Sequence, residues 1–191
     1  NSSARLKALS DVIVTSSNAV KVVSRLKEKN IYFIPDKNLG RYVAAQLPEK
    51  NFYFGWGCCP IHNATSLNEI AAAKAAHPGA LLLAHPECPG EVCAQAAYVG
   101  STAGIIAYAQ KSTEKEFLVG TEAGTLYELS RRCPEKKFYP TRPDFLCADM
   151  KKITLEAIER IFAGEGTPLE VEPVVAEKAA RALKRMLELA Q

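Results

Sequence analysis

An internal repeat constrains the fold of this chain more than any other feature of its sequence. The segment Pro48–Tyr53 returns 86 residues later as Pro134–Tyr139, with five of six residues identical. Two more segments match in the same order: Phe33–Gly40 with Phe117–Gly124 at an offset of 84, and Val14–Val20 with Val99–Ile105 at an offset of 85. Because a repeated sequence predicts a repeated structural unit, we expect two similar units along the chain.

Each copy alternates apolar, strand-like runs with amphipathic stretches of about 10 residues, the length of a short helix. The expected strands are Val12–Val14, Ile31–Ile34, Asn51–Phe54, Leu81–Ala84, Phe117–Val119 and Lys137–Tyr139. This alternation predicts βαβ units and parallel sheets, and therefore an α/β fold. Because charged residues do not alternate along the strands, we expect sheets that are covered on both faces.

The two copies differ at their first strand. In the second copy that strand ends in His85-Pro86-Glu87, whereas the first copy begins beyond the point where its own first strand would have finished. We therefore expect the sequence to be part of a longer protein. The expected divisions are a first unit over 1–60, a second over 61–148 and a C-terminal helical segment over 149–191.

Two helical regions lie outside the matched segments. A helix over Ser66–His77 should connect the two units, with Asn63 or Ser66 as its N-cap. From Ile153 to Gln191 the pattern is helical with a break at Gly164–Pro168, and the apolar face of Ala176–Leu189 predicts packing against the rest of the protein.

The composition is that of a globular protein. Of the 191 residues, 48% are hydrophobic and 24% are charged, which is typical of a packed fold. The net charge of +3 is scattered rather than gathered in a basic stripe, so we expect no nucleic-acid partner. No apolar run approaches the roughly 20 residues of a membrane span, and Asn1–Ala4 does not resemble a signal peptide. We expect a soluble, cytoplasmic protein.

Polar residues follow several of the expected strands. Ser16 comes after Val14, Thr102 follows Val99, and His85 and Glu87 follow Ala84. Ligands of parallel sheets gather at the carboxyl ends of the strands, and hydroxyl groups at helix starts suit a carboxylate or a phosphate. The same residue types are ordinary N-caps, so both interpretations of Ser16 and Thr102 stay open.

Two of the six cysteines occupy corresponding places in the repeat. Cys59 lies 11 residues after Pro48, and Cys147 lies 13 residues after Pro134. Iron–sulfur clusters are held by cysteine thiolates, and a third equivalent unit would supply a third thiolate. Three protein ligands would leave one iron open to a substrate, as in catalytic rather than structural metal sites.

The other cysteines and histidines have simpler interpretations. Cys58, Cys88, Cys93 and Cys133 have no repeat counterpart, and the last two are expected to be buried free thiols. Cys59 is preferred to Cys58 because His62 stands three residues beyond it. His77, at a helix end, is expected to interact with the helix dipole.

Several ordered blocks of the sequence resemble the quinolinate synthase family over nearly the whole chain. They are Asn1–Ala4, Thr15–Ala19, Pro35–Gly40, Gly57–His62, His85–Cys88, Gly100–Thr102, Thr121–Gly124 and Cys147–Glu156. The resemblance implies three αβα domains around a pseudo-threefold axis, each giving one cysteine to a four-iron four-sulfur cluster. This chain would hold two of the three domains.

The resemblance also implies an activity in NAD biosynthesis. Iminoaspartate would condense with dihydroxyacetone phosphate, with loss of phosphate and water, to give quinolinate, and the open iron would act as a Lewis acid. L-aspartate oxidase or a dehydrogenase would supply the iminoaspartate. Without the N-terminal domain, which would complete the site, this chain alone is expected to be inactive.

The resemblance assigns roles by motif position. Cys59 and Cys147 would ligate iron, and His62 would contact the substrate or the surroundings of the cluster. Glu87 and His85 would transfer protons, with the carboxyl group of Glu87 tuned toward neutral pH by its shielded position. The residues expected to bind the iminoaspartate-derived part are Asn1, Ser16, His85, Pro86, Glu87 and Thr102. The alternative function is a non-catalytic α/β module that uses Ser16 and Thr102 to bind an anion.

Overall fold

A computed structural model describes residues 2–191, so Asn1, one of the expected binding residues, lies outside the described residues. The described chain forms two compact units. Val14–Leu146 makes up the first, here called the sheet unit, which contains all strands of the described chain. The second, here called the terminal unit, joins the residues up to Ile13 with Cys147–Gln191. The boundaries at residues 60 and 148 stay a prediction.

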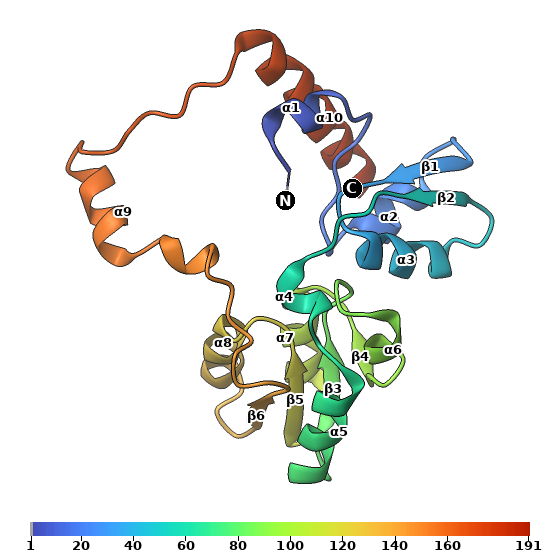
Figure 1. Cartoon of the computed structure of the whole chain (residues 1–191), viewed down its shortest axis with the longest axis vertical. Helices are drawn as coiled ribbons and strands as arrows, with labels where there is room; N and C mark the ends of the chain where they lie inside the picture. The colour runs from blue at the N-terminus through green and yellow to red at the C-terminus, as the bar shows by residue number, and fades with distance from the viewer. Residues whose placement is uncertain (1) are drawn as a thin grey trace. The chain divides into compact units, whose positions relative to one another are not determined.

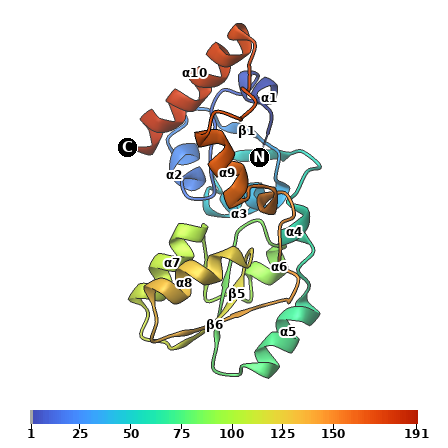
Figure 2. The same ribbon diagram turned by 90° about the vertical axis from the view of Figure 1, so that its left-hand side faces the viewer.

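The larger sheet of the sheet unit is a four-stranded parallel sheet with strand order β4-β3-β5-β6. Its strands are β3 (Leu81–Ala84), β4 (Tyr98–Val99), β5 (Glu116–Gly120) and β6 (Lys137–Pro140). Helices cover both faces (Figures 1 and 2): α5 (Leu67–Ala76) and α6 (Gly90–Cys93) on one, α7 (Thr102–Lys111) and α8 (Gly124–Arg132) on the other. This αβα layering confirms the expected fold class.

Successive residues of the central strands explain why both faces are covered. Leu82 and Leu118 point into the cluster formed with α5 and α6, whereas Leu83 and Phe117 point into the cluster formed with α7 and α8. All four side chains are at most 2% exposed. Full burial of an aliphatic or aromatic side chain of this size contributes about 1.5–3 kcal/mol, so these two clusters dominate the stability of the sheet.

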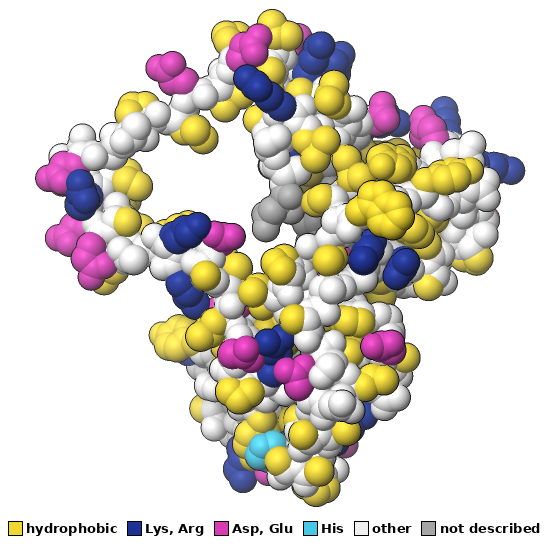
Figure 3. Space-filling model, in the orientation of Figure 1, with side chains coloured by type: hydrophobic (Ala, Val, Ile, Leu, Met, Phe, Trp, Pro, Cys, Tyr) yellow, Lys and Arg dark blue, Asp and Glu magenta, His cyan; other side chains and the backbone are white. Residues whose placement is uncertain are grey.

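The smaller sheet pairs β1 (Asn30–Phe33) with β2 (Asn51–Phe54) in parallel. Its helices, α2 (Ala19–Ser24) and α3 (Lys37–Gln46), pack against the face that carries Ile31 and Phe33. Tyr32 and Tyr53, partners across the opposite face, are 68% and 57% exposed. Figure 3 shows hydrophobic side chains gathered over this part of the unit. The expected cover on both faces is therefore present in the larger sheet, while the smaller sheet shows an exposed face.

Equivalent lysines explain why the Pro-Glu-Lys segment is the best preserved part of the repeat. The Nζ of Lys50 donates to the carbonyls of Leu26 and Glu28, and the Nζ of Lys136 donates to those of Ala109 and Ser112. In both copies the ammonium group thus bonds backbone carbonyls in or near the end of the equivalent helix, which is α2 before β1 in the first copy and α7 before β5 in the second. Such charge-assisted hydrogen bonds are stronger than neutral ones.

The structural repeat keeps an offset of 86, so the offset of 84 expected for Phe33 is wrong. Phe33 accepts a hydrogen bond from the backbone N–H of Gly55, as Val119 does from that of Thr141. The equivalent of Phe33 is therefore Val119 rather than Phe117. At this offset Asp36 corresponds to Glu122, and both are buried carboxyl groups that accept backbone N–H groups.

Val12–Val14 is not a strand, contrary to expectation. Its counterpart β4 pairs only with β3, and residues 2–191 supply no counterpart of β3 to the smaller sheet. A strand forms only where a neighbour accepts its hydrogen bonds, and the N–H of Ile13 instead bonds the carbonyl of Ala182, at 3.4 Å. The remaining expected strands are confirmed within a residue or two at each end.

The expected connecting helix is confirmed as α5, and Ser66 is its N-cap. Ser66 and Glu69 form a reciprocal capping box, in which each side chain bonds the backbone N–H of the other. Asn63 instead ends the short helix α4 (Pro60–Asn63). His77 is the C-cap of α5, and its ring stacks on that of Tyr139 with 3.5 Å between centroids.

The terminal unit consists of helices. α1 (Ala4–Ala8) packs against α10 (Pro173–Ala190), in which Ala182 and Met186 are buried. Between Cys147 and α10 the chain forms η1 (Met150–Lys152) and α9 (Leu155–Phe162). The expected break contains Gly164, whose positive φ of 81° suits glycine. No helix within residues 2–191 is both long and apolar enough to span a membrane.

Candidate functional site

Cys59 is held at the start of α4 by a tightly packed loop that follows β2. A Cβ atom on Gly57 would lie 2.4 Å from the carbonyl oxygen of Pro35, so only glycine allows this approach of the two backbones. The carboxylate of Asp36 accepts the backbone N–H of Cys59 at 2.6 Å and that of Leu39 at 2.7 Å. Asp36 therefore caps α3 and fixes the cysteine loop at the same time.

His62 lies one turn beyond Cys59 and connects three groups. Its Nδ1 lies 3.1 Å from the Sγ of Cys59 and 3.2 Å from an Oε of Glu87. On the other side of the ring, Nε2 is 3.0 Å from the Oγ1 of Thr121. The buried ring stacks on that of His85 at 4.6 Å and meets the edge of Phe145 at 5.4 Å. These contacts set the orientation of the imidazole.

Glu87 and His85 reach this point from the end of β3. His85 is 6% exposed, and its Nδ1 accepts the backbone N–H of Glu87 at 3.3 Å. The Glu87 carboxylate lies 3.8 Å from that same nitrogen. Asn38 braces this loop, because its Nδ2 donates to the carbonyl of Glu87 at 2.9 Å and to the Oδ1 of Asn63 at 2.8 Å.

The charges of the site follow from these hydrogen bonds. Burial alone would lower the pKa of His62, but its hydrogen bonds to Cys59 and Glu87 outweigh burial and raise that pKa to about 9. Burial would raise the pKa of Cys59, but the hydrogen bond from His62 leaves it below the usual thiol value. Without a bound metal, the imidazole of His62 therefore makes the thiolate of Cys59 easier to form than that of an ordinary cysteine.

The pKa of Glu87 is shifted in the direction opposite to the one expected from the sequence. Burial raises the pKa of its carboxyl group, but the hydrogen bond from His62 and the charges of His85 and His62 outweigh burial and lower that pKa. The carboxylate is therefore held ionised rather than tuned toward neutral pH. Burial and the nearby His62 lower the pKa of His85, which favours a neutral imidazole.

Within the sheet unit, this cluster of contacts does not include the expected residues Ser16, Pro86 and Thr102. Thr102 is the exposed first residue of α7, whose cap is the side chain of Ser101. Ser16 is half-buried in the turn before α2, and Pro86 is buried between His85 and Glu87. Cys147 is half-buried in the terminal unit. Their expected roles stay predictions.

The six cysteines, all within the described residues, form no disulfide bond with one another. Cys133 is buried, as expected, whereas Cys93 is half-buried and Cys88 is the more buried of that neighbouring pair. Burial raises the pKa of Cys88 to about 12 and that of Cys93 to about 11. These two thiols are therefore poor nucleophiles and poor ligands beside Cys59.

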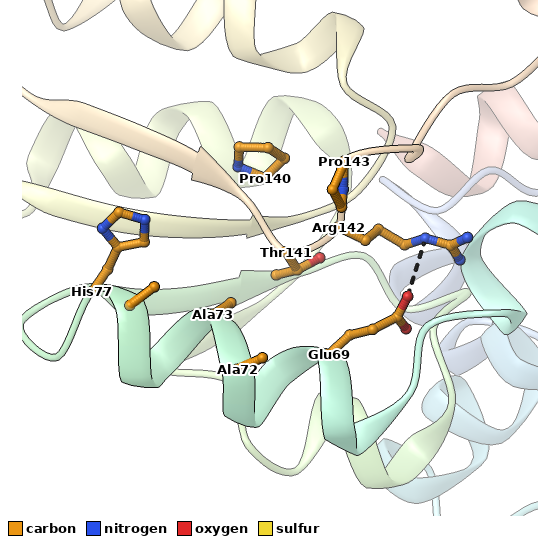
Figure 4. Close-up of a pocket in the computed structure, with 9 residues that line it drawn as sticks. Glu69, Ala72, Ala73, His77, Pro140, Thr141, Arg142 and Pro143 are labelled. Carbon is orange, nitrogen blue, oxygen red and sulfur yellow. Dashed lines mark ion pairs between the residues drawn. The ribbon is translucent and has the colours of Figure 1, made fainter.

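A separate cavity lies between α5 and the loop that follows β6 (Figure 4). Its walls are alanines of α5 opposite Pro140 and Pro143, and Arg142 bonds across it to Glu69 at 3.5 Å. Arg142 also donates to the carboxylate of Asp144 through its Nε at 2.8 Å and one Nη at 2.9 Å. None of the expected site residues lines this cavity.

Three residues of the site carried no functional expectation from the sequence. An acidic residue directly before a helix predicts an N-cap, so the capping role of Asp36 can be expected from the sequence. Its second contact, with Cys59, cannot, because it joins positions 23 residues apart. Asn38 and Thr121 act through partners 49 and 59 residues away. Only the folded chain brings these partners together.

Cys59, His62 and Glu87 together form a possible metal site. One ligand atom from each lies within 4.8 Å of the other two. The fold and this group of side chains define a parallel α/β protein with a thiolate, an imidazole and a carboxylate gathered at the ends of its strands.

Comparison with known proteins specifies the family. Residues 1–188 match the family model described as Quinolinate synthetase A protein. The quinolinate synthase of Caldicellulosiruptor saccharolyticus is 48% identical over 189 residues, which are 99% of this chain and 62% of that protein. Those of Clostridioides difficile and Methanoregula boonei are 44% and 43% identical, over 63% and 62% of their lengths. The chain therefore belongs to the quinolinate synthase family, and it spans less than two thirds of these relatives.

Proposed function

We propose that this chain carries part of the active site of a quinolinate synthase of NAD biosynthesis. The observation that carries the proposal is the convergence of Cys59, His62, His85 and Glu87 from the two repeat units, in a chain of this family. The whole protein would condense iminoaspartate with dihydroxyacetone phosphate, releasing phosphate and water. Because this chain spans about 62% of its relatives, we expect it to be inactive without the remaining part.

The cysteine at this site suits an iron–sulfur cluster. Cys59 is half-buried, and the hydrogen bond from His62 lowers its pKa against the effect of burial, which favours the thiolate form that binds iron. Cys59 and Cys147 would each supply one thiolate to a four-iron four-sulfur cluster, with a third from the remaining domain. When bound, the cluster would supply an open iron that acts as a Lewis acid toward the substrate.

The protein groups would move protons and orient the substrate. Glu87, held as a carboxylate, is suited to accept a proton from the condensing substrate. His62 can return a proton through the nitrogen that faces Glu87, and neutral His85 can donate or accept a hydrogen bond. The iminoaspartate-derived part would be bound by Asn1, Ser16, His85, Pro86, Glu87 and Thr102.

Iron and sulfide analysis tests the cluster. After anaerobic reconstitution of the full-length protein, we expect stoichiometric iron and sulfide and a brown chromophore. Cys59→Ala and Cys147→Ala should each abolish the chromophore, whereas the matched control Cys93→Ala should leave it. Iron near zero after reconstitution would reject the cluster and favour the anion-binding alternative, and equal effects of all three variants would reject the choice of ligands.

Turnover of Glu87→Gln tests the proton transfer. The amide keeps the size of the side chain but cannot accept a proton, so quinolinate formation should fall by about 10² or more while the chromophore is retained. Wild-type turnover in this variant would remove Glu87 from the mechanism.

A further inference from the structure

Helix α3 carries two polar side chains that reach out of the first copy of the repeat. Asn38 and Tyr42 stand four residues apart, so they lie one above the other on the same face of the helix. The Nδ2 of Asn38 donates to the backbone carbonyl of Glu87 at 2.9 Å, and the hydroxyl group of Tyr42 donates to that of Val99 at 3.1 Å. These acceptors lie 49 and 57 residues further along the chain, in the second copy. One face of α3 therefore supports the second copy at two points.

The two supported segments leave the larger sheet side by side. Residues 85–88, here called the β3 loop, follow β3, and residues 100–102, here called the β4 loop, follow β4. The last residues of these strands, Ala84 and Val99, are partners in the parallel sheet, and the backbone N–H of Gly100 donates to the carbonyl of Ala84 at 3.1 Å. A helix that is bonded to both segments therefore limits how far the two loops can move apart.

We propose that Asn38 and Tyr42 are positioning residues, through which α3 holds Glu87 and Thr102 in place for the reaction. This inference rests on the proposed function, in which Glu87 accepts a proton and Thr102 binds the substrate. Asn38 acts on the β3 loop and Tyr42 on the β4 loop, and neither is assigned a contact with the substrate itself. A shift of about 1 Å in a catalytic group can cost roughly 10²-fold in rate, so hydrogen bonds that fix these loops should affect turnover.

Another side of α3 is locked into the smaller sheet, which makes the helix a firm support. Val43 is fully buried in the core cluster of this sheet, next to Leu39. A Cβ atom on Gly40 would lie 2.9 Å from the rings of Phe33 and Phe54, so the helix backbone approaches the sheet closely. This packing restricts movements of α3 relative to the smaller sheet.

The side-chain amide of Asn38 connects two parts of the candidate site. Besides the carbonyl of Glu87, its Nδ2 bonds the Oδ1 of Asn63 at 2.8 Å. Asn63 ends α4, the short helix that carries His62. Because Asn38 is buried, water competes little for these bonds. The same amide group thus ties the β3 loop to the end of α4.

The two copies of the repeat differ at these polar positions of the helix. At the offset of 86, Val43 of α3 corresponds to Leu129 of α8, and both are fully buried in the core clusters of their sheets. Asn38 corresponds to a glycine, and Tyr42 corresponds to Glu128, which pairs with arginines of its own helix. A helix of this repeat therefore packs on its sheet without an amide or a phenol at these places, so packing alone does not require them.

Hydrogen exchange of the full-length protein tests the support of the loops without reference to activity. Asn38→Leu keeps the size of the side chain but removes its donor, and Tyr42→Phe removes only a hydroxyl group. Loss of one hydrogen bond should speed amide exchange by about 2- to 10-fold, mainly in the β3 loop for Asn38→Leu and in the β4 loop for Tyr42→Phe. Val43→Ala is the matched control, since it weakens the packing of α3 in the smaller sheet and should leave the exchange of both loops unchanged.

Unchanged exchange of both loops in Asn38→Leu and Tyr42→Phe would overturn the inference. An equal effect of Val43→Ala would overturn it as well, because any weakening of α3 would then release the loops. Asn38→Ala replaces Asn38→Leu if circular dichroism shows that the latter is not folded.

Turnover of the reconstituted full-length protein tests what the support is for. Asn38→Leu should lower kcat by about tenfold because Glu87 is displaced, and Tyr42→Phe should chiefly raise the KM for iminoaspartate, by about 2- to 10-fold. In the Glu87→Gln background, Asn38→Leu should cause little further loss, because its effect passes through Glu87. A purely structural role would instead multiply the two losses. Multiplied losses, or wild-type kinetics in Asn38→Leu and Tyr42→Phe, would overturn the inference.

The two experiments separate the positioning role from the proposed function. Faster exchange of the loops in the variants of a protein that forms no quinolinate would reject the proposed function, while the support of the loops by α3 would stand. Quinolinate formation by the unchanged protein, together with wild-type exchange in both variants, would do the reverse.

Discussion

The thiols of this chain differ in reactivity because their surroundings differ. Cys59 and Cys93 are both half-buried, but only Cys59 has a hydrogen-bonding imidazole beside its sulfur. The Sγ of Cys93 instead lies 3.7 Å from the carbonyl oxygens of His85 and Cys88, which cannot stabilise a negative charge. Burial consequently raises the pKa of Cys93 to about 11, whereas the pKa of Cys59 is lowered.

This difference predicts selective alkylation. A thiol with a pKa of about 11 is roughly 0.01% thiolate at pH 7, and the thiolate is the nucleophile. In the metal-free chain, iodoacetamide should therefore label Cys59 at least about tenfold faster than Cys93. As the pH falls from 9 to 6, labelling of Cys59 should fall less than labelling of Cys93, because the pKa of Cys59 is lowered and that of Cys93 is raised.

Mass spectrometry of labelled peptides measures both rates. His62→Gln removes the imidazolium, so it should raise the pKa of Cys59 and slow its labelling without changing that of Cys93. Equal rates for the two cysteines in the unchanged chain would contradict the assigned thiolate.

At the residue scale, spacing and position in the sequence predict part of the candidate site. Cys59 and His62 stand three residues apart on one turn, and His85 and Glu87 directly follow a strand, so local rules point to all four. Asp36, Asn38 and Thr121 depend on partners far away in the chain. The ionised state of Glu87 also depends on tertiary contacts, because the imidazoles that lower its pKa could not be placed by the sequence alone.

At the scale of elements, one carboxylate links helix α3 to the cysteine loop. Asp36→Ala removes a helix cap and leaves the N–H of Cys59 without its acceptor, so we expect a loss of about 1–3 kcal/mol in the free energy of unfolding. Urea denaturation measures this loss. The rate of Cys59 alkylation should change as well, because the loop that carries the thiol is released.

Ser101→Ala is the matched control for Asp36→Ala. Ser101 caps α7 through the N–H of Gly104 but bonds no backbone group of the cysteine loop. We expect it to lower stability by about 1 kcal/mol and to leave the labelling of Cys59 unchanged. If both variants altered the labelling equally, Asp36 would have no specific link to Cys59.

A second element-scale prediction concerns the approach of the cysteine loop to Pro35. Gly57→Ala places a methyl group 2.4 Å from a backbone oxygen, so the loop must shift, and we expect a destabilisation of about 1–3 kcal/mol. Gly79→Ala is the control, since a Cβ atom there meets nothing within 4 Å. Equal midpoints of thermal unfolding for the two variants would refute the close approach.

Periodicity found most elements, and the exceptions show what it cannot detect. Apolar runs located β2 and β3 to the residue, because buried strands have a local composition. Val12–Val14 has the same composition but forms no strand, because the described part of the chain offers no neighbouring strand to pair with it. The composition of a segment does not reveal whether it has such a neighbour. The repeat is visible in the sequence, but the predicted offset at Phe33 is wrong. Matching Phe33 to Phe117 pairs two aromatic residues, whereas the hydrogen bonds of the sheet make Val119 the equivalent of Phe33.

At the scale of the whole molecule, the two sheets of the sheet unit should differ in stability. β3 and β5 lie inside a four-stranded sheet covered on both faces, whereas β1 and β2 form a two-stranded sheet with Tyr32 and Tyr53 exposed. An isolated pair of strands is marginally stable, and the apolar cover of the smaller sheet comes mainly from the helices α2 and α3 on one face. The smaller sheet should therefore open locally before the whole unit unfolds.

Hydrogen exchange tests this order. Amides of β3 and β5 should exchange at least about tenfold more slowly than those of β1 and β2, which corresponds to a difference of about 1.4 kcal/mol in opening free energy. Leu118→Ala, which creates a cavity at a fully buried position of β5, should cost about 2–5 kcal/mol. It should speed exchange mainly in the larger sheet, because Leu118 packs only within that sheet's cluster. Uniform exchange in both sheets, in the unchanged chain and in the variant, would instead mean that the sheet unit opens as a single cooperative body.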